Sequence, residues 1–204
     1  MIRYPNGKRY ERKERVLANQ QPTTFSNRGQ SLEDELNTTN TFYVASGEAV
    51  VHKKPTPIQI VDVHYPKRSA ARITEAYFRT PSTTDYNGVW NGWHLDFEAK
   101  ETKNKTSFPL QNIHDHQVEH MKRVHTHGGI VFFIVKWTTL ERYFALFFDD
   151  FYPFWQRMLD GGRKSITLQE MERRAYELTL HYQPRLPYLQ AVERYVNEKR
   201  GNEK

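Results

Sequence analysis

The chain has 204 residues, of which 37% are hydrophobic and 14% aromatic, enough for one domain with an aromatic-rich core. It has no cysteine, which excludes disulfide bridges, thiolate zinc sites and a cysteine nucleophile and is compatible with a reducing cytoplasm. Its 30 basic and 24 acidic side chains give a net charge of +6, which favours a polyanionic partner. The basic N-terminus is no secretory signal, and the longest apolar run, residues 129–135, is too short to cross a bilayer. We therefore expect a cytoplasmic protein without membrane association.

The N-terminal segment is strongly basic. Residues 1–30 contain seven basic side chains and two acids, a net charge of +5. Residues 1–27 show neither helical nor strand periodicity, so we expect a mobile arm there and a single domain over residues 28–204. A solvated tail and a nucleic-acid-binding arm are both compatible with this pattern.

The domain is expected to begin with a helix. Ser26 or Asn27 is a candidate N-cap for a helix that starts near Gly29, and Gly47 is expected to end it. Apolar and small residues recur at helical spacing in between, at Leu32, Leu36, Thr39 and Tyr43.

Two short strands are expected next, at residues 49–52 and 58–63, followed by a long basic connection at residues 66–81. This connection has a net charge of +3 and two neighbouring aromatic residues that are candidates for stacking on unpaired bases or for packing against protein. Connections this long are usually functional or disordered. The candidate DNA-binding residues of the segment are Lys67, Arg68, Arg72, Arg79, Tyr77 and Phe78.

The most informative stretch is a predicted hairpin of residues 85–89 and 93–102, which turns through Asn91-Gly92. Glu98 and Lys100 stand two residues apart on one strand and therefore share a face, and Asp85 lies on the partner strand. Phosphodiester hydrolysis needs an activated water and neutralised charge, which a divalent metal held by carboxylates supplies.

Asp85 and Glu98 are therefore candidate ligands of Mg²⁺, which prefers oxygen, and Lys100 is a candidate stabiliser of negative charge in the transition state. Asp96 lies on the same face and is not among the expected ligands; it is a candidate for a supporting group behind them. Glu33 and Glu48 are compatible both with a place near the metal and with the protein surface. An ordinary exposed strand with weak ion pairs is the competing interpretation of this pattern.

The remainder alternates helices and strands. We expect helices near residues 113–124, 165–180 and 186–199, and buried strands at residues 130–137 and 143–148. Asp149 is expected to cap a further aromatic helix that runs to Leu159. The alternation predicts an α/β or α+β architecture.

Two other functional classes are compatible with the sequence. Residues 116–120 fit H-x-x-E-H, a zinc-protease pattern with two histidines on one helical face, but no third ligand is identifiable. The basic segments also suit a non-catalytic protein that binds branched DNA or modulates a recombinase.

Several motifs together resemble the RecU family of Holliday junction resolvases, within the PD-(D/E)xK nuclease superfamily. The resemblance covers essentially the whole chain, and its most specific run is D-F-E-A-K-E-T-K at residues 96–103. The general nuclease motif usually has proline before its first aspartate, whereas Thr84 stands there in this chain. The other matching runs are N-R-G at 27–29, G-E-A-V-V-H-K-K-P-T-P at 47–57, T-D-Y-N-G at 84–88, F-P-L at 108–110, H-Q at 116–117 and G-G at 128–129.

The resemblance implies a restriction-endonuclease-like core, a central mixed β-sheet flanked by helices, with residues 66–81 as a projecting basic stalk. It also implies a homodimer that binds four-way DNA junctions and nicks opposing strands with Mg²⁺, or with Mn²⁺ in its place, in recombination and repair. Thr83 and Gln117 would complete the metal site of Asp85 and Glu98, with Lys100 as the catalytic lysine. Modulation of the RecA recombinase and a role in chromosome segregation are implied by the resemblance alone.

Overall fold

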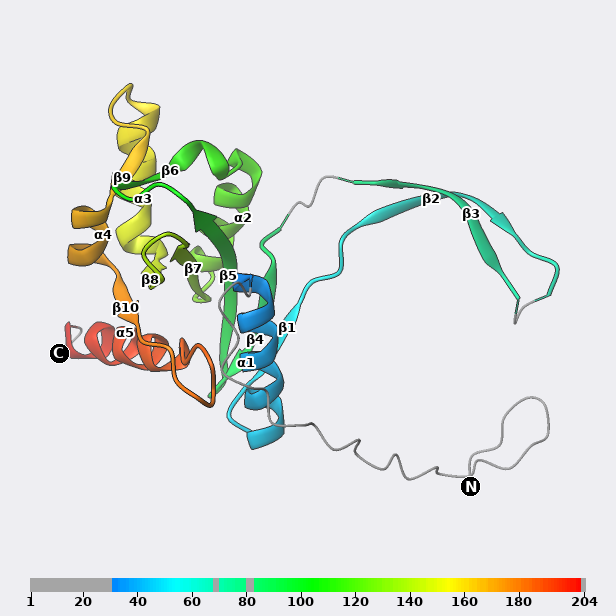
Figure 1. Cartoon of the computed structure of the whole chain (residues 1–204), viewed down its shortest axis with the longest axis horizontal. Helices are drawn as coiled ribbons and strands as arrows, with labels where there is room; N and C mark the ends of the chain where they lie inside the picture. The colour runs from blue at the N-terminus through cyan, green and yellow to red at the C-terminus, as the bar shows by residue number, and fades with distance from the viewer. Residues whose placement is uncertain (1–30, 68–69, 80–82, 203–204) are drawn as a thin grey trace. The chain divides into compact units, whose positions relative to one another are not determined.

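The computed structural model describes residues 31–67, 70–79 and 83–202. The expected arm at residues 1–27 and the candidate DNA-binding residue Arg68 lie outside these ranges. The elements follow in the order α1 (Leu32–Ser46), β1 (Val50–Lys53), β2 (Ile58–His64), β3 (Arg72–Phe78), β4 (Tyr86–Trp90), β5 (Trp93–Thr102), β6 (Ser107–Pro109), the 3₁₀ helix η1 (Leu110–Asn112), α2 (Asp115–Thr126), β7 (Ile130–Trp137), β8 (Arg142–Phe147), α3 (Phe148–Leu159), β9 (Ser165–Thr167), α4 (Leu168–Arg174), β10 (Tyr176–Leu178) and α5 (Leu189–Asn202) (Figure 1).

A six-stranded sheet in the order β1-β4-β5-β7-β8-β10 forms the centre of the fold (Figure 1). Strands β5 and β7 are parallel and all other neighbours in this sheet are antiparallel. The chain passes from β5 to β7 through β6, η1 and α2, which is the long crossover that parallel neighbours require. The expected α/β fold with a mixed central sheet flanked by helices is confirmed.

Alternate side chains of the sheet enter two separate cores. On β7, Phe132 and Ile134 pack with residues of α1 and α5, whereas Val131, Phe133 and Val135 pack with residues of α2, α3 and α4. Both faces of the central strands are therefore covered, which explains why β7 is buried along its whole length. Among the described residues, no helix is long and apolar enough to span a membrane.

The β4–β5 hairpin forms as expected. Its two turn residues, Asn91 and Gly92, have φ angles of 47° and 81°, the left-handed conformations that a two-residue type I′ turn needs. Tyr86 pairs with Phe97 and Asn87 with Asp96. On the other side of β4, a Cβ atom at Gly88 would lie 2.2 Å from the carbonyl oxygen of Val50, so the close pairing with β1 requires glycine there.

The first helix begins later than expected. Ser31 is its N-cap, and its side chain accepts a hydrogen bond of 3.2 Å from the backbone nitrogen of Asp34. The expected start near Gly29, with a cap at Ser26 or Asn27, was wrong because Ser31 satisfies the exposed amides of the first turn. Gly47 ends the helix in a left-handed conformation, as expected.

Two expectations for the C-terminal half were also wrong. Helix α3 begins at Phe148 after Phe147, so Asp149 lies inside its first turn and does not cap it. The single helix expected over residues 165–180 is a strand, a seven-residue helix and another strand. Thr167 and Glu170 form a capping box that starts the short helix, and β10 then pairs with β8 at the edge of the sheet.

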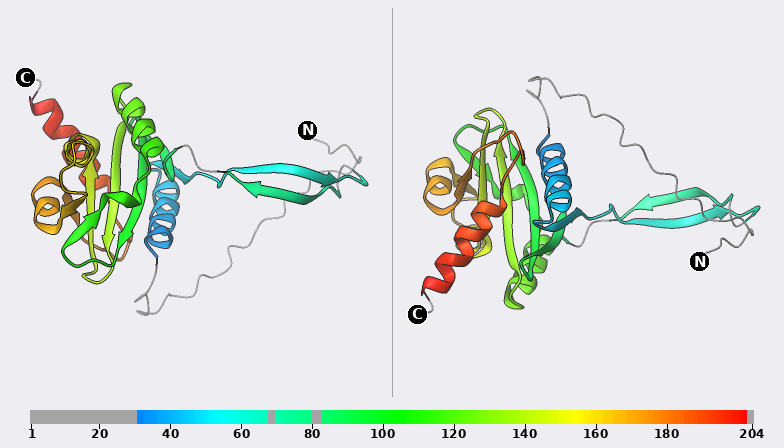
Figure 2. Two further views of the ribbon diagram at one scale, coloured as in Figure 1. Left: turned by 90° about the horizontal axis from the view of Figure 1, so that it is seen from above. Right: turned by 90° about the horizontal axis from the view of Figure 1, so that it is seen from below.

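The basic connection contains a strand that the sequence did not indicate. Strand β3 pairs antiparallel with β2, and the two strands form a two-stranded sheet of their own. Figure 2 shows them side by side in both views. Every residue of both strands is exposed, including Ile60, Tyr77 and Phe78. An exposed hairpin with so many apolar side chains is a surface suited to contact with a partner.

Candidate active site

The two candidate carboxylates meet where β4 begins. Because Tyr86 pairs with Phe97, the preceding residue, Asp85, lies across from Glu98. The backbone nitrogen of Asp85 donates a hydrogen bond of 3.0 Å to Oε2 of Glu98, and the backbone nitrogen of Ala99 donates one of 3.4 Å to Oδ2 of Asp85. Each carboxylate is thus held by the backbone beside the other.

Glu98 also has two side-chain partners. The ammonium of Lys100, two residues along β5, lies 2.7 Å from Oε1 of Glu98. The side-chain nitrogen of Gln117, on α2, donates a hydrogen bond of 2.6 Å to the same oxygen. The oxygen of Gln117 accepts a hydrogen bond of 3.2 Å from the backbone nitrogen of His114, so in this arrangement its nitrogen faces the carboxylates.

Burial changes the acidity of Glu98. Glu98 is 1% exposed, and its burial, together with the negative charge of Asp85, outweighs the attraction of Lys100 and raises the pKa of Glu98 to about 7. A cation bound beside two such carboxylates would stabilise their ionised forms, so this pair is a candidate cation site.

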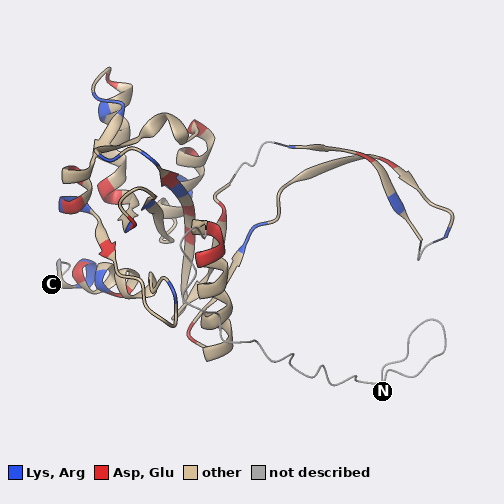
Figure 3. Ribbon diagram, in the orientation of Figure 1, with Lys and Arg blue, Asp and Glu red and all other residues tan. Residues whose placement is uncertain are grey.

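An open pocket of about 250 Å³ lies beside Asp85. It is lined by Glu33, by residues 53–57 and by residues 83–85. Thr83 lines it, with its hydroxyl donating to the carbonyl oxygen of Thr84 at 3.4 Å. Glu33, from the start of α1, and Lys53, from the end of β1, form an ion pair at its rim. Acidic residues gather at the start of α1 in Figure 3, close to the basic end of β1.

The oxygen-bearing side chains of the candidate site suit a hard divalent cation. Asp85 and Glu98 supply two carboxylates, the Gln117 amide is bonded to Glu98, and the Thr83 hydroxyl belongs to the lining of the pocket beside Asp85. Mg²⁺ completes such partial sets of oxygen ligands with water. Nitrogen and sulfur donors, which zinc prefers, are not gathered there, and the described residues include no group of three or more histidine, aspartate and glutamate side chains that could hold a metal.

The residues of the H-x-x-E-H pattern have separate partners. Glu119 pairs with Arg123 one turn further along α2, and Nε2 of His120 lies 3.2 Å from Oδ1 of Asp96. His116 stacks on His114 and lines a different pocket, between α2 and α3. The protease interpretation therefore gains no support from the described part of the chain.

Asp96 is among the most buried polar residues of the described chain, at 1% exposed. Its carboxylate contacts side chains from three segments: the Lys54 ammonium, the Thr84 hydroxyl and the His120 ring. Sequence reasoning found neither Lys54 nor the function of Thr84. The available signal was Thr84 itself, which stands where the general nuclease motif described above usually has proline.

The candidate DNA-binding residues that the structure describes belong to the β2–β3 hairpin and its ends, not to the strands that carry the carboxylates. Tyr77 is 59% and Phe78 84% exposed, and the hydroxyl of Tyr77 donates to Glu75 at 2.6 Å. Arg79 donates two hydrogen bonds, of 3.1 and 3.0 Å, to the side-chain oxygen of Gln59. Lys67 and Arg72 are exposed. In Figure 3 acidic residues also lie on the hairpin, so its charge is mixed along its length.

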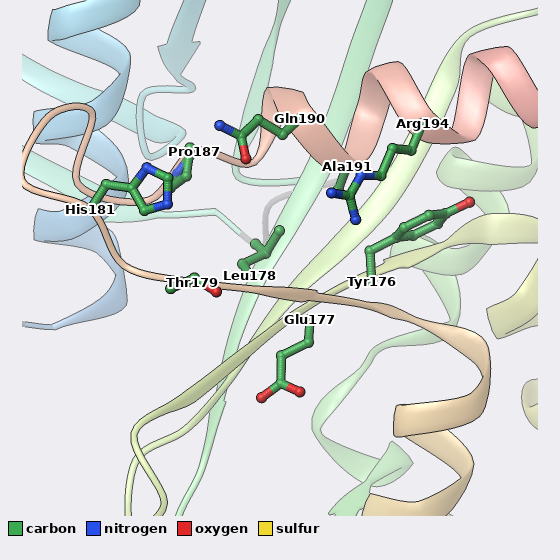
Figure 4. A pocket seen from close by; sticks show the side chains of 9 residues that line it. All are labelled: Tyr176, Glu177, Leu178, Thr179, His181, Pro187, Gln190, Ala191 and Arg194. Atoms are coloured by element: carbon green, nitrogen blue, oxygen red, sulfur yellow. The ribbon is translucent and has the colours of Figure 1, made fainter.

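A second pocket, of about 290 Å³, lies at the opposite edge of the central sheet from β1, between β10 and the first part of α5. Figure 4 shows the Arg194 guanidinium beside the ring of Tyr176, with Glu177 on the strand below. None of the candidate metal-binding or DNA-binding residues lines it.

Comparison with known proteins agrees with these motifs. The model of the family described as "RecU: Recombination protein U" matches residues 27–194. A Holliday junction resolvase RecU of Staphylococcus aureus (strain JH9) is 54% identical over 200 residues, which cover 96% of each chain. A protein of the same name from Staphylococcus epidermidis is 53% identical over 201 residues, again 96% of each chain. The family match spans most of the chain and the identity is high, so this chain belongs to the RecU family.

Proposed function

We propose that this protein is a Holliday junction resolvase, an endodeoxyribonuclease that binds four-way DNA junctions and hydrolyses phosphodiester bonds in opposing strands during recombination and repair. The proposal rests on one observation: Asp85 and Glu98 lie next to each other across the β4–β5 hairpin, and Lys100 forms an ion pair with Glu98. Relatives that share 54% of the sequence over nearly the whole chain bear the name of that activity.

The reaction depends on a divalent metal, and we propose Mg²⁺, with Mn²⁺ as a substitute. When bound, the metal neutralises charge on the phosphate and makes water a better nucleophile. Asp85 and Glu98 would hold it, Thr83 would add a hydroxyl oxygen, and Gln117 would contribute its oxygen after exchanging its bond to His114. Lys100 would stabilise the negative charge that develops on the phosphate or orient the attacking water.

We propose that the sheet and helices form a restriction-endonuclease-like core over residues 28–204, preceded by a basic arm at residues 1–27. The β2–β3 hairpin, whose first strand precedes the basic segment at residues 66–81, would be the stalk. Its net charge from residue 58 to 79 is +2, four bases against two acids, and its exposed Tyr77 and Phe78 suit stacking on unpaired bases at the branch point.

Paired nicking of a two-fold symmetric junction requires two linked active sites, so the working form is proposed to be a homodimer. The exposed apolar residues of the hairpin, among them Ile60 and Val61, are compatible with contact between two copies. Modulation of a recombinase of the RecA type is a further proposal that follows from family membership.

A synthetic four-way junction tests the function directly. The protein is incubated with it, with and without Mg²⁺, and cuts are mapped on all four strands. Symmetric nicks on opposing strands that require the metal are the expected result. Binding without cleavage in Mg²⁺ and in Mn²⁺ would instead indicate a non-catalytic branched-DNA-binding protein, and random cuts in linear DNA would indicate a nuclease without junction selectivity.

A further inference from the structure

An ion pair between Lys54 and the buried carboxylate of Asp96 lies beside the candidate active site, where Lys54 and Thr84 line the same pocket as Asp85. The ammonium of Lys54 donates hydrogen bonds to Oδ2 of Asp96 at 2.7 Å and to the hydroxyl of Thr84 at 2.9 Å. The Thr84 hydroxyl also donates to Oδ1 of Asp96. The side chain of Asp96 is 2% exposed and that of Lys54 is 19% exposed, so both charges are largely removed from water. The attraction within such a pair offsets the cost of removing both charges from water only when further hydrogen bonds satisfy the charged groups, as Thr84 does here.

These three residues come from segments that surround the carboxylates. Thr84 stands between two candidate site residues, Thr83 and Asp85, and Asp96 precedes Glu98 by two residues on the same face of β5. Lys54 bonds to this segment a second time, because its backbone nitrogen donates to the carbonyl oxygen of Asp85 at 2.7 Å. The ion pair therefore holds the segment 83–85 against β5 from both its backbone and its side chains.

The hydrogen bonds of Thr84 explain why a threonine suits position 84 better than a proline would. Proline has no side-chain hydroxyl, so it could not join the Lys54–Asp96 pair. Thr84 is 2% exposed, and its hydroxyl is both a donor to Asp96 and an acceptor from Lys54. The Thr84 hydroxyl thus links the segment 83–85 to the Lys54–Asp96 pair in a way that a proline could not.

The same lysine stands where the hairpin leaves the core. Lys54 follows the last residue of β1, and the next three residues lead to β2. The returning strand is tied to this connection, since the backbone nitrogen of Arg79 donates to the carbonyl oxygen of Pro57 at 2.9 Å. The outgoing connection is thus anchored at the ion pair, four residues before the hairpin begins.

We infer that Lys54 and Asp96 are positioning residues: through Thr84, their buried pair fixes the segment 83–85 at the root of the hairpin and so sets the placement of the Asp85 carboxylate. This inference rests on the proposed cleavage at Asp85 and Glu98. Neither residue contacts the scissile phosphate in this account. Partners that orient metal-binding groups typically change metal affinity or activity about 10–100-fold when they are removed.

The test compares four variants of the full chain. Lys54→Met removes the ammonium, Thr84→Val removes the hydroxyl at constant shape, Thr84→Ser keeps the hydroxyl, and Lys136→Met removes a different buried lysine, which pairs with Glu35 at 3.2 Å. Binding of Mn²⁺ to the protein alone is measured by calorimetry, amide exchange of residues 83–86 by mass spectrometry, and junction cleavage under single-turnover conditions at saturating DNA.

Lys54→Met and Thr84→Val are expected to weaken Mn²⁺ binding or slow cleavage about 10–100-fold, and to speed amide exchange at residues 83–86, with junction affinity within about threefold of wild type. Thr84→Ser should restore most of the loss. Lys136→Met should lower thermal stability without changing Mn²⁺ affinity or local exchange, which separates positioning from general destabilisation.

Three outcomes would overturn the inference: unchanged Mn²⁺ affinity, exchange and rate in Lys54→Met; equal impairment in Thr84→Ser and Thr84→Val; or equal changes in Lys54→Met and Lys136→Met. A wild-type protein that cuts no junction would refute the proposed function. Metal affinity and amide exchange need no cleavage, so they would still decide whether Lys54 positions the segment.

Discussion

The backbone nitrogen of Asp85 donates a hydrogen bond of 3.0 Å to Oε2 of Glu98. This bond fixes the two candidate metal ligands relative to each other through the main chain. Replacing either carboxylate by its amide therefore removes charge while the neighbouring backbone keeps its place. The pair can be tested by substitution with little risk to the fold.

Loss of either carboxylate should abolish cleavage. We expect Asp85→Asn and Glu98→Gln to reduce the single-turnover rate by at least about 1,000-fold, since each removes a charge that holds the metal, while junction affinity stays within a few-fold. Glu119→Gln is the matched control, because Glu119 is an exposed acid on α2 that pairs only with Arg123 among the contacts described above. Rates are measured on a labelled four-way junction.

The same variants distinguish the protease interpretation. In the H-x-x-E-H pattern Glu119 would be the general base, so Glu119→Gln would eliminate activity there and leave Asp85→Asn active. Full nuclease activity in Asp85→Asn or in Glu98→Gln would contradict the site proposed for this chain.

Lys100 should affect the rate more than the affinity. Its ammonium forms an ion pair with Oε1 of Glu98. From there it could stabilise the negative charge that develops on the phosphate in the transition state. Lys100→Met should therefore lower the cleavage rate by about 100-fold or more and change junction affinity by less than about threefold. Lys103→Met, an exposed lysine just after β5, is the control. A loss of affinity without a loss of rate would assign Lys100 to DNA binding.

The acidity of Glu98 predicts a pH dependence. Its pKa in the folded protein, about 7, lies above the ordinary value of 4.5, so the folded state holds this proton more tightly than the unfolded state. The metal-free protein should therefore lose stability as pH rises from about 4.5 through 7, and Glu98→Gln should lack that component. Thermal melts of both proteins at pH 5 and pH 8 measure the difference.

Metal binding has the opposite dependence on pH. Because a bound metal needs the ionised carboxylate, its apparent affinity should rise about tenfold between pH 6 and pH 8. Calorimetric titration of Mn²⁺ at the two pH values measures this. An affinity that does not change would mean that Glu98 is already ionised at pH 6 or is not a ligand.

Neutralising the hairpin should weaken junction binding and its salt dependence. Each phosphate contact that is lost lowers the slope of log affinity against log salt by about 0.9, so replacing all four basic residues should be visible in the slope. The replaced residues are Lys67, Arg68, Arg72 and Arg79. The control replaces four exposed basic residues elsewhere in the chain, Lys164, Arg173, Arg194 and Arg200. Equal slopes in both variants would show that net charge alone is responsible.

Much of the central sheet follows from short-range patterns. The Asn91-Gly92 turn and the alternation along β5 were enough to place Asp85 on the strand that pairs with β5 and to put Glu98 and Lys100 on the same face; the structure added that Asp85 lies across from Glu98. A two-residue turn sets the register of its strands, and the strand period of two then decides which side chains share a face. These contacts are local in sequence, so the sequence indicated them correctly.

The elements that were wrong depend on distant partners. Residues 176–178 form a strand because β8 offers them an open edge, and residues 72–78 form one because β2 pairs with them. Neither segment has a strong alternating pattern of its own. Strand formation by such segments is decided by the neighbour and not by local propensity.

By itself, the sequence determined the carboxylate pair and its lysine, since these contacts need only one hairpin, and the resemblance added Gln117. Only the tertiary structure decided that the amide nitrogen of Gln117 faces Glu98 and that Lys54 and His120 converge on Asp96. The packing of α2 on β5 and the pairing of β1 with β4 bring these side chains together over 19 to 42 residues of sequence. Such convergence depends on the burial of both faces of the sheet, a property of the whole fold that no local pattern carries.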